Sequence, residues 1–168
     1  MATSFQIPVA DYLASVYRPD CEYIDGELIE RNVGERDHSS AQMRLSAYLF
    51  HRSAELGIHV YPEQRVQVHR NRYRVPNICV VLGDEPEGQV FTAPPFLCIE
   101  ILSRGDTMTS LQERVRDYLD FGVAFVWMVD PRRRCASIYT KDRMIEAQTT
   151  LLTSNPEIAV PLSAIFPG

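Results

Sequence analysis

Three apolar runs, with an amphipathic segment between the last two, constrain most strongly how this chain can fold. The runs YRVPNICVVL (73–82) and PFLCIEIL (95–102) are apolar nearly throughout, which is typical of strands covered on both faces. The run VAFVWMVDP (123–131) has the same character. Between the last two runs, apolar residues recur at helical spacing: Leu111, Val115, Tyr118 and Leu119. A helix that joins two strands in this way predicts a right-handed parallel crossover within a mixed sheet.

The remaining segments predict a hairpin and further strands around this core. A short helix opens at Pro8, and the two-residue turn Asp25-Gly26 in CEYIDGELIERN predicts a hairpin, because both central positions of such a turn favour positive φ. A strand-like run covers 58–68, and CASIYT (135–140) is the expected antiparallel neighbour of the last apolar run. The tail from 151 to 166 alternates Pro and apolar residues, so we expect it to pack over an edge.

Two helices carry recognisable end signals. Asp37 or Ser39 can cap a long helix that runs to the stop signal Gly57. The apolar stripe of that helix consists of Ala41, Leu45, Tyr48, Leu49 and Leu56. In the crossover helix, Ser110 and Glu113 have the spacing of a capping box.

The predicted elements give an α/β fold, with a mixed β-sheet flanked by helices in α-β-β-β-α-β order. The 168 residues match the usual size of one domain, so we expect a single domain over 1–168. Within it, the N-terminal helix and hairpin occupy 8–31, the core occupies 37–140, and the C-terminal tail occupies 151–168.

Charge limits the kind of partner that the chain can bind. A net charge of −5 argues against strong nonspecific binding of nucleic acid by the whole molecule, although a local basic surface is compatible with it. Of the 17 basic residues, Lys141 is the only lysine. The arginines at 65, 70, 72 and 74 are either a phosphate-binding ridge or a solvated surface, and the same two interpretations apply to the turn 132–134.

Cysteine usage and hydropathy indicate a cytosolic protein without zinc. The cysteines, Cys21, Cys79, Cys98 and Cys135, lie far apart and form no CxxC pair or Cys/His cluster, so we expect buried thiols. No apolar run approaches the roughly 20 residues of a membrane span, and the start lacks the pattern of a secretory signal. Cytosol is therefore the expected location.

Two polar residues interrupt the apolar strands. Asn77 lies within VPNICVVL, and Glu100 lies within FLCIEILS. A buried carboxylate is costly unless it is paired. On adjacent strands the two side chains could converge on one Mg²⁺, which accepts carboxylate, carbonyl and water oxygens. The alternative is a structural glutamate that forms an ion pair with a core arginine.

The chain resembles the bacterial Uma-type restriction-endonuclease families of the PD-(D/E)XK nuclease superfamily. The segments that carry the resemblance are EYIDGELIE, PEQRVQV, RVPNICVV, PPFLCIEILS and LQERVRDYLDFGVAFVWMVDP, in the expected order over roughly residues 9 to 140. The resemblance implies a restriction-endonuclease-like core and a Mg²⁺- or Mn²⁺-dependent endonuclease that hydrolyses DNA phosphodiester bonds.

The resemblance also implies roles for individual residues. Asn77 falls on the position of a metal-binding Asp, Glu100 on the second acidic position, and the carbonyl of Ile101 on a backbone ligand. Leu102 stands where the superfamily has its signature lysine, and Arg114 on the following helix is the candidate substitute. The alternative for Arg114 is a surface ion pair with Glu113, Asp117 or Asp120. His38 and Glu63 fall on positions similar to polar ones in the family, and His38 could instead cap its helix.

The departures from the family pattern predict a weakened or inactive site. Asn77 is neutral, so the site has one negative charge fewer than the family pattern, and arginine is a poor proton donor or acceptor. The alternative function is a noncatalytic module that binds nucleic acid or protein on a nuclease scaffold. DNA is the expected partner, a homodimer would suit cleavage of both strands, and no organic cofactor or membrane is expected.

Overall fold

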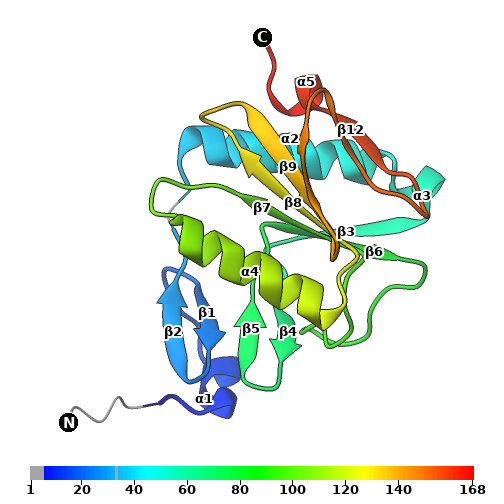
Figure 1. Cartoon of the computed structure of the whole chain (residues 1–168). Helices are drawn as coiled ribbons and strands as arrows, with labels where there is room; N and C mark the ends of the chain where they lie inside the picture. The colour runs from blue at the N-terminus through cyan, green and yellow to red at the C-terminus, as the bar shows by residue number, and fades with distance from the viewer. Residues whose placement is uncertain (1–5, 33) are drawn as a thin grey trace.

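A six-stranded mixed sheet forms the centre of the protein, in the order β10-β9-β8-β7-β6-β3 (Figure 1). The structure is a computed structural model, and it describes residues 6–32 and 34–168. The strands of this sheet are β3 (Ile58–Pro62), β6 (Ile78–Leu82), β7 (Leu97–Ile101), β8 (Phe125–Asp130), β9 (Cys135–Tyr139) and β10 (Met144–Ala147). Strands β7 and β8 are parallel and are joined by α4 (Met108–Phe121), whereas the other neighbours are antiparallel. The expected parallel crossover and mixed sheet are confirmed.

A second sheet of four strands, in the order β2-β1-β5-β4, lies below the first in Figure 1. It consists of β1 (Cys21–Ile24), β2 (Glu27–Glu30), β4 (Val66–His69) and β5 (Arg72–Arg74), beside the short helix α1 (Val9–Ala14). Strands β1 and β2 form the hairpin that the sequence predicts, with positive φ at Asp25 and Gly26.

The prediction that 58–68 and 73–82 are single strands was wrong, because each run divides between the two sheets. The first run breaks after β3 at Glu63, whose φ of 54° belongs to the left-handed region and ends the extended chain. The second breaks between β5 and β6 at Val75-Pro76-Asn77, where proline has no N–H to donate to a ladder. The candidate residues Glu63 and Asn77 therefore lie where the chain passes between the sheets.

The long helix that the sequence predicts up to Gly57 is shorter in the structure. It is α2 (Arg36–His51), followed after Arg52 by a separate turn, α3 (Ser53–Leu56), and by Gly57 with φ 63°. Its N-cap is Glu35, which makes no side-chain cap, so neither Asp37 nor Ser39 has the predicted capping role.

The crossover helix begins one turn before the predicted cap. Thr107 is the N-cap of α4 and forms a reciprocal capping box with Ser110, so the predicted box of Ser110 with Glu113 was wrong. Serine at the third helical position makes the return hydrogen bond that glutamate or glutamine usually makes. The helix ends at Gly122, whose φ is 112°.

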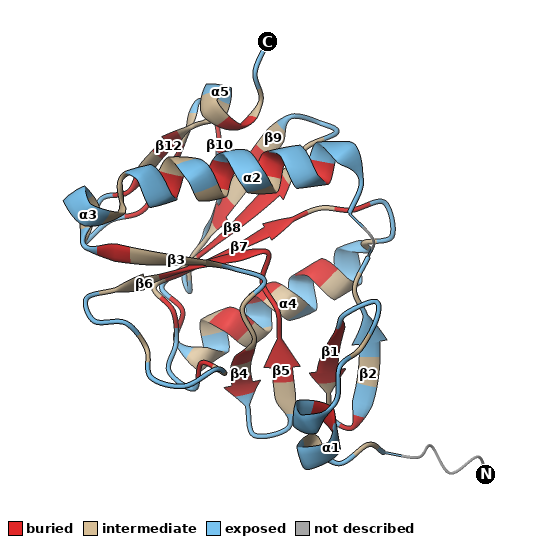
Figure 2. Ribbon diagram, turned by 180° about the vertical axis from the view of Figure 1, so that it is seen from behind, coloured by how far each residue is buried: buried red, intermediate tan, exposed pale blue. Residues whose placement is uncertain are grey.

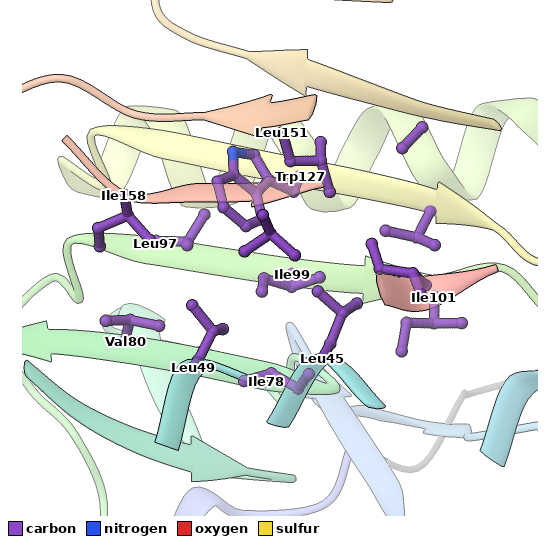
Figure 3. Packing of buried hydrophobic residues seen from close by; sticks show 14 of the residues in the cluster. Leu45, Leu49, Ile78, Val80, Leu97, Ile99, Ile101, Trp127, Leu151 and Ile158 are labelled. Atoms are coloured by element: carbon purple, nitrogen blue, oxygen red, sulfur yellow. The ribbon is translucent and has the colours of Figure 1, made fainter. Parts of the chain in front are cut away.

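Helices cover the two faces of the six-stranded sheet with separate cores (Figure 2). On one face, Leu45 and Leu49 of α2 pack against alternate side chains of β6, β7 and β8, including Trp127 (Figure 3). On the other face, α4 packs against the intervening side chains, which include Cys79 and Cys98. Strands β6 and β7 are therefore covered on both faces, as their apolar sequences predict.

The C-terminal tail packs against α2. It forms the hairpin of β11 (Thr150–Leu152) and β12 (Ala159–Pro161) and then α5 (Leu162–Ile165), whose buried residues join the α2 core. Of the described residues, no helix is long and apolar enough to cross a membrane.

Candidate active site

Asn77 and Glu100 face the same small cavity, of about 50 Å³. Asn77 immediately precedes β6, Glu100 lies in the neighbouring strand β7, and both side chains are buried. The amide oxygen Oδ1 of Asn77 accepts a hydrogen bond of 2.7 Å from the backbone N–H of Ile101. This bond fixes the orientation of the amide, because only its oxygen can accept from an N–H.

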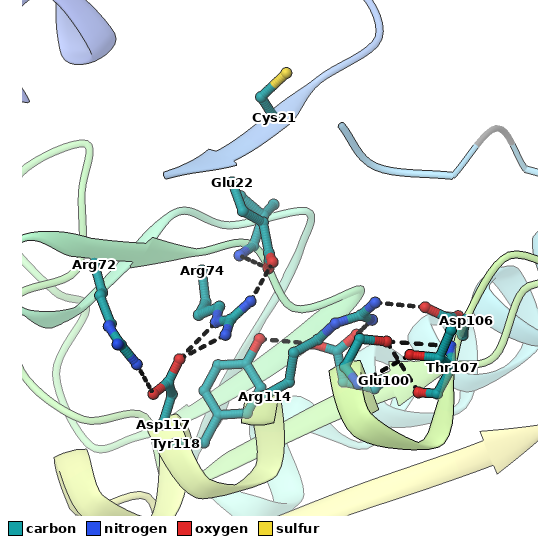
Figure 4. A network of polar contacts seen from close by, with 12 residues as sticks. Cys21, Glu22, Arg72, Arg74, Glu100, Asp106, Thr107, Arg114, Asp117 and Tyr118 are labelled. Carbon is teal, nitrogen blue, oxygen red and sulfur yellow. Dashed lines mark hydrogen bonds and ion pairs between the residues drawn. The ribbon is translucent and has the colours of Figure 1, made fainter. Parts of the chain in front are cut away.

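The carboxylate of Glu100 is held by two donors from α4 (Figure 4). The hydroxyl of Tyr118 donates to Oε1 at 2.6 Å, and Nη1 of Arg114 donates to Oε2 at 3.1 Å. Glu100 is only 2% exposed, and burial raises its pKa although the charge of Arg114 opposes that rise. Two accepted hydrogen bonds leave the carboxylate with unused lone pairs toward the cavity.

Arg114 also pairs with Asp106, from the loop before α4, so its guanidinium bridges two carboxylates. Burial disfavours its charge, yet Glu100, Glu22 and Asp106 together raise its pKa above the usual value. The alternative ion pairs of Arg114 with Glu113, Asp117 or Asp120 are not formed among the described residues. The structure thus brings the candidate lysine substitute to the acidic position.

Glu63 contacts Asn77 from the break after β3. Its Oε1 accepts hydrogen bonds from Nδ2 of Asn77 at 3.3 Å and from Nε2 of Gln42 at 2.5 Å. Its other oxygen, Oε2, forms an ion pair with Arg31. The Asn77 amide therefore links Glu63 to the backbone of β7: its nitrogen donates to Glu63, and its oxygen accepts from Ile101.

His38 lines the same cavity from the first turn of α2. Burial and the nearby charge of Arg31 lower its pKa, while the charge of Asp106 acts in the opposite direction. Its ring atom Nδ1 is buried and has no hydrogen-bond partner among the described residues. The lowered pKa disfavours the protonated ring, whose charge would repel a cation in the cavity.

Glu22 is a residue of this cavity that sequence reasoning missed. It belongs to β1 of the second sheet, and its carboxylate accepts from the N–H of Val75 at 3.0 Å and from Arg74 at 2.7 Å (Figure 4). Arg74 also pairs with Asp117 of α4. The signal that could have found Glu22 is the one that found Glu100, a charged residue within the buried strand CEYI.

The arginines at 65, 70, 72 and 74, which lie in β5 and beside β4, do not form a free basic ridge, because most of them contact residues of the protein itself. Arg72 pairs with Asp25 and Asp117, and Arg74 pairs with Glu22 and Asp117. The guanidinium of Arg65 lies 4.5 Å from the centroid of the Tyr12 ring. Of the proposed ridge, Arg70 alone has no such side-chain contact among the described residues.

The oxygen atoms around the cavity that could bind a metal are the ligand type that Mg²⁺ prefers. The candidate donors are the carboxylates of Glu100 and Glu22, the amide oxygen of Asn77 and the backbone carbonyl of Ile101. They do not amount to a strong site, since no three His, Cys, Asp or Glu side chains of the described chain form a metal-binding group. Arg31 and Arg114 add two positive charges at the same cavity.

Comparison with known proteins identifies the family. The model of the Uma2 family, described as putative restriction endonuclease, matches residues 9–167. The chain belongs to the Uma2 family. A search of curated proteins found no match. The crystal structure of a putative nuclease belonging to DUF820 from Anabaena variabilis ATCC 29413 is similar, with a TM-score of 0.82 and 20% identity over 95% of this chain and 97% of that chain. The restriction-endonuclease-like fold is thereby confirmed, and the family supports a nuclease-like function.

Proposed function

We propose that this Uma2 protein is a divalent-metal-dependent endonuclease of DNA whose activity is weakened by Asn77. The observation that carries the proposal is the convergence of Asn77, Glu100 and the Ile101 backbone, from two adjacent strands, on one buried cavity. Restriction-endonuclease-like proteins generally use a divalent metal. Glu100, Asn77 and the carbonyl of Ile101 would hold Mg²⁺ or Mn²⁺, with Glu22 as a further carboxylate. We also propose that the protein acts in the cytosol as a homodimer.

When bound, the ion would lower the pKa of an attacking water and neutralise the scissile phosphate. Arg114 is the candidate substitute for the signature lysine, but its guanidinium cannot exchange a proton near pH 7. Its role would be electrostatic, because a fixed positive charge beside Glu100 stabilises negative charge that develops on the phosphate. Tyr118 would orient the Glu100 carboxylate through its hydrogen bond to Oε1.

Asn77 accounts for the expected weakness. Its single oxygen already accepts the N–H of Ile101, and its nitrogen is turned toward Glu63. A neutral amide contributes less attraction to a dication than a carboxylate would.

A noncatalytic nucleic-acid-binding module is the second candidate. It is favoured by the ion pair of Glu100 with Arg114 and its hydrogen bond from Tyr118, because a buried carboxylate with an internal cation needs no metal to be stable.

Cleavage of supercoiled plasmid in Mn²⁺ separates the two candidates. We expect slow nicking by the wild type, faster nicking by Asn77→Asp, and none by the double variant Asn77→Asp/Glu100→Gln. EDTA should abolish all nicking. If neither the wild type nor Asn77→Asp nicks the plasmid while both bind it, the noncatalytic module is the correct description.

A further inference from the structure

A larger groove adjoins the candidate active site. Its volume is about 530 Å³, and it lies between α4 and strands β8 and β9, on the face of the sheet that α4 covers only in part. Ser103 and Asp106 line both this groove and the 50 Å³ cavity. A chain-like ligand that reaches the cavity can therefore continue into the groove without leaving the surface.

The floor of the groove is apolar. Its apolar residues include Leu111 and Val115 of α4, Met128 of β8 and Tyr139 of β9. Met108, which is 68% exposed, stands at the rim beside the candidate active site. Tyr139 is the aromatic residue of this lining, and stacking of a nucleobase on an aromatic ring tolerates any base.

Unpaired cations stand along the groove on both sides. Arg116 comes from α4, Arg132 and Arg133 from the turn between β8 and β9, and Lys141 from the turn after β9. All of them are exposed, and none forms an ion pair with a described residue. The strand directions put Arg132 and Arg133 near the end of β7 that carries Glu100, and Lys141 at the opposite end of the groove.

The groove also contains three aspartates, two of which are already engaged. Asp106 pairs with Arg114, and Asp130 accepts the backbone N–H groups of Arg132 and Arg133. Asp120 is the remaining acidic group. Asp130 keeps its negative charge in these bonds, so the four cations of the groove face two carboxylates, Asp120 and Asp130, that have no cationic partner among the described residues. The lining is still net positive, although the whole chain carries a net charge of −5.

We propose that this groove binds an unpaired stretch of the DNA substrate beside the scissile phosphate, with bases on the apolar floor and phosphates against the cations. The groove has the size of a small-ligand site, about 300–1,000 Å³, which accommodates roughly one or two nucleotides and excludes a double helix. This inference rests on the proposed function. It implies a preference for single-stranded ends, flaps or gaps over continuous duplex.

Fluorescence anisotropy with labelled oligonucleotides in EDTA tests the groove without cleavage. The probes are a single strand, a blunt duplex of the same sequence, and that duplex with a single-stranded tail. The variants are Arg133→Glu and Lys141→Glu, with Arg70→Glu as the matched control, because Arg70 is exposed on the far β4–β5 turn and the charge change is the same. We expect each groove variant to weaken binding of the single strand and the tailed duplex about tenfold, and to lower the salt dependence, while the control stays within about twofold.

The outcomes separate the groove from the proposed function. If the wild type binds DNA but the groove variants behave like Arg70→Glu, the groove inference is overturned and the proposed function stands. If the wild type binds none of the probes, the groove inference is overturned, and plasmid nicking in Mn²⁺ decides the proposed function separately. Light scattering completes the test, because loss of a wild-type dimer in Lys141→Glu would identify the groove as an interface between copies and would also overturn the inference.

Discussion

Single residues within the apolar strands were the most informative part of the sequence. Asn77 and Glu100 could be singled out because a polar side chain in a buried strand needs a partner, and the structure gives each of them partners. Glu22 carries the same signal, but its role, like that of Asp106, could not be read from the sequence. Their meaning depends on contacts with Arg74 and Arg114, which are 52 and 8 residues away along the chain.

Glu100 provides a residue-scale prediction about stability. Glu100→Ala would leave the buried guanidinium of Arg114 and the hydroxyl of Tyr118 without this acceptor. We expect a loss of about 3 kcal/mol in the free energy of unfolding, the lower end for a broken buried ion pair, because Arg114 retains Asp106. Glu100→Gln keeps the shape and one acceptor, so it should lose less than half as much. Urea denaturation measures both, and equal stability of the wild type and both variants would show that the pair contributes nothing.

At the scale of elements, types and order were more predictable than boundaries. The crossover β7-α4-β8 follows from hydrophobic periodicity, which is strong over long segments. The division of 58–68 and 73–82 between two sheets does not follow from periodicity, because the apolar pattern continues on both sides of each break. The breaks are caused by single residues, the left-handed Glu63 in the first run and Pro76 in the second.

The cap of α4 provides a test at this scale. Thr107→Ala removes the side-chain acceptor of the Ser110 N–H, and we expect a loss of about 1 kcal/mol in unfolding free energy. Glu113→Ala is the matched control, since it alters the predicted but absent capping box, and its effect should stay within about 0.5 kcal/mol. The reverse order of effects would mean that the helix begins at Ser110.

The hairpin turn between β1 and β2 provides a prediction about pH. Hydrogen bonds from Arg72 lower the pKa of Asp25. Its stabilising contribution is therefore present above the unfolded pKa of about 3.9 and is lost as the pH falls through the lower folded value. Asn tolerates the positive φ of this position, so Asp25→Asn changes mainly the charge. The melting temperature of Asp25→Asn should lie below that of the wild type at pH 7, and the gap should close near pH 2. A gap of the same size at both pH values would point to geometry instead of charge.

At the scale of the whole molecule, the candidate site lies where the two sheets and both long helices meet. Asn77 and Glu100 come from the six-stranded sheet, Glu22 from the four-stranded sheet, His38 from α2 and Arg114 from α4. The sequence predicted the first sheet and both helices, but it did not predict that the hairpin would pair with β5 and bring Glu22 to the cavity. Such long-range pairing has no local signal in the sequence.

If this junction is a weakened metal site, Asn77→Asp should strengthen it. The two side chains are nearly isosteric, but the new carboxylate would replace the amide nitrogen that donates to Glu63 at 3.3 Å. Without metal, the repulsion should lower the melting temperature. With metal, one more unit charge at roughly 2–4 Å from a dication is worth several kcal/mol at an effective dielectric of about 20. Even one-third of that value gives at least about tenfold tighter binding.

The measurement is thermal unfolding of the wild type and Asn77→Asp, each in EDTA and in Mn²⁺. Because a ligand that binds only the folded state raises the melting temperature, tighter binding appears as a larger shift. We expect Asn77→Asp to melt below the wild type in EDTA and to gain more in melting temperature from Mn²⁺. Equal Mn²⁺ shifts in the two proteins would contradict this expectation, because position 77 would then not be part of a metal site.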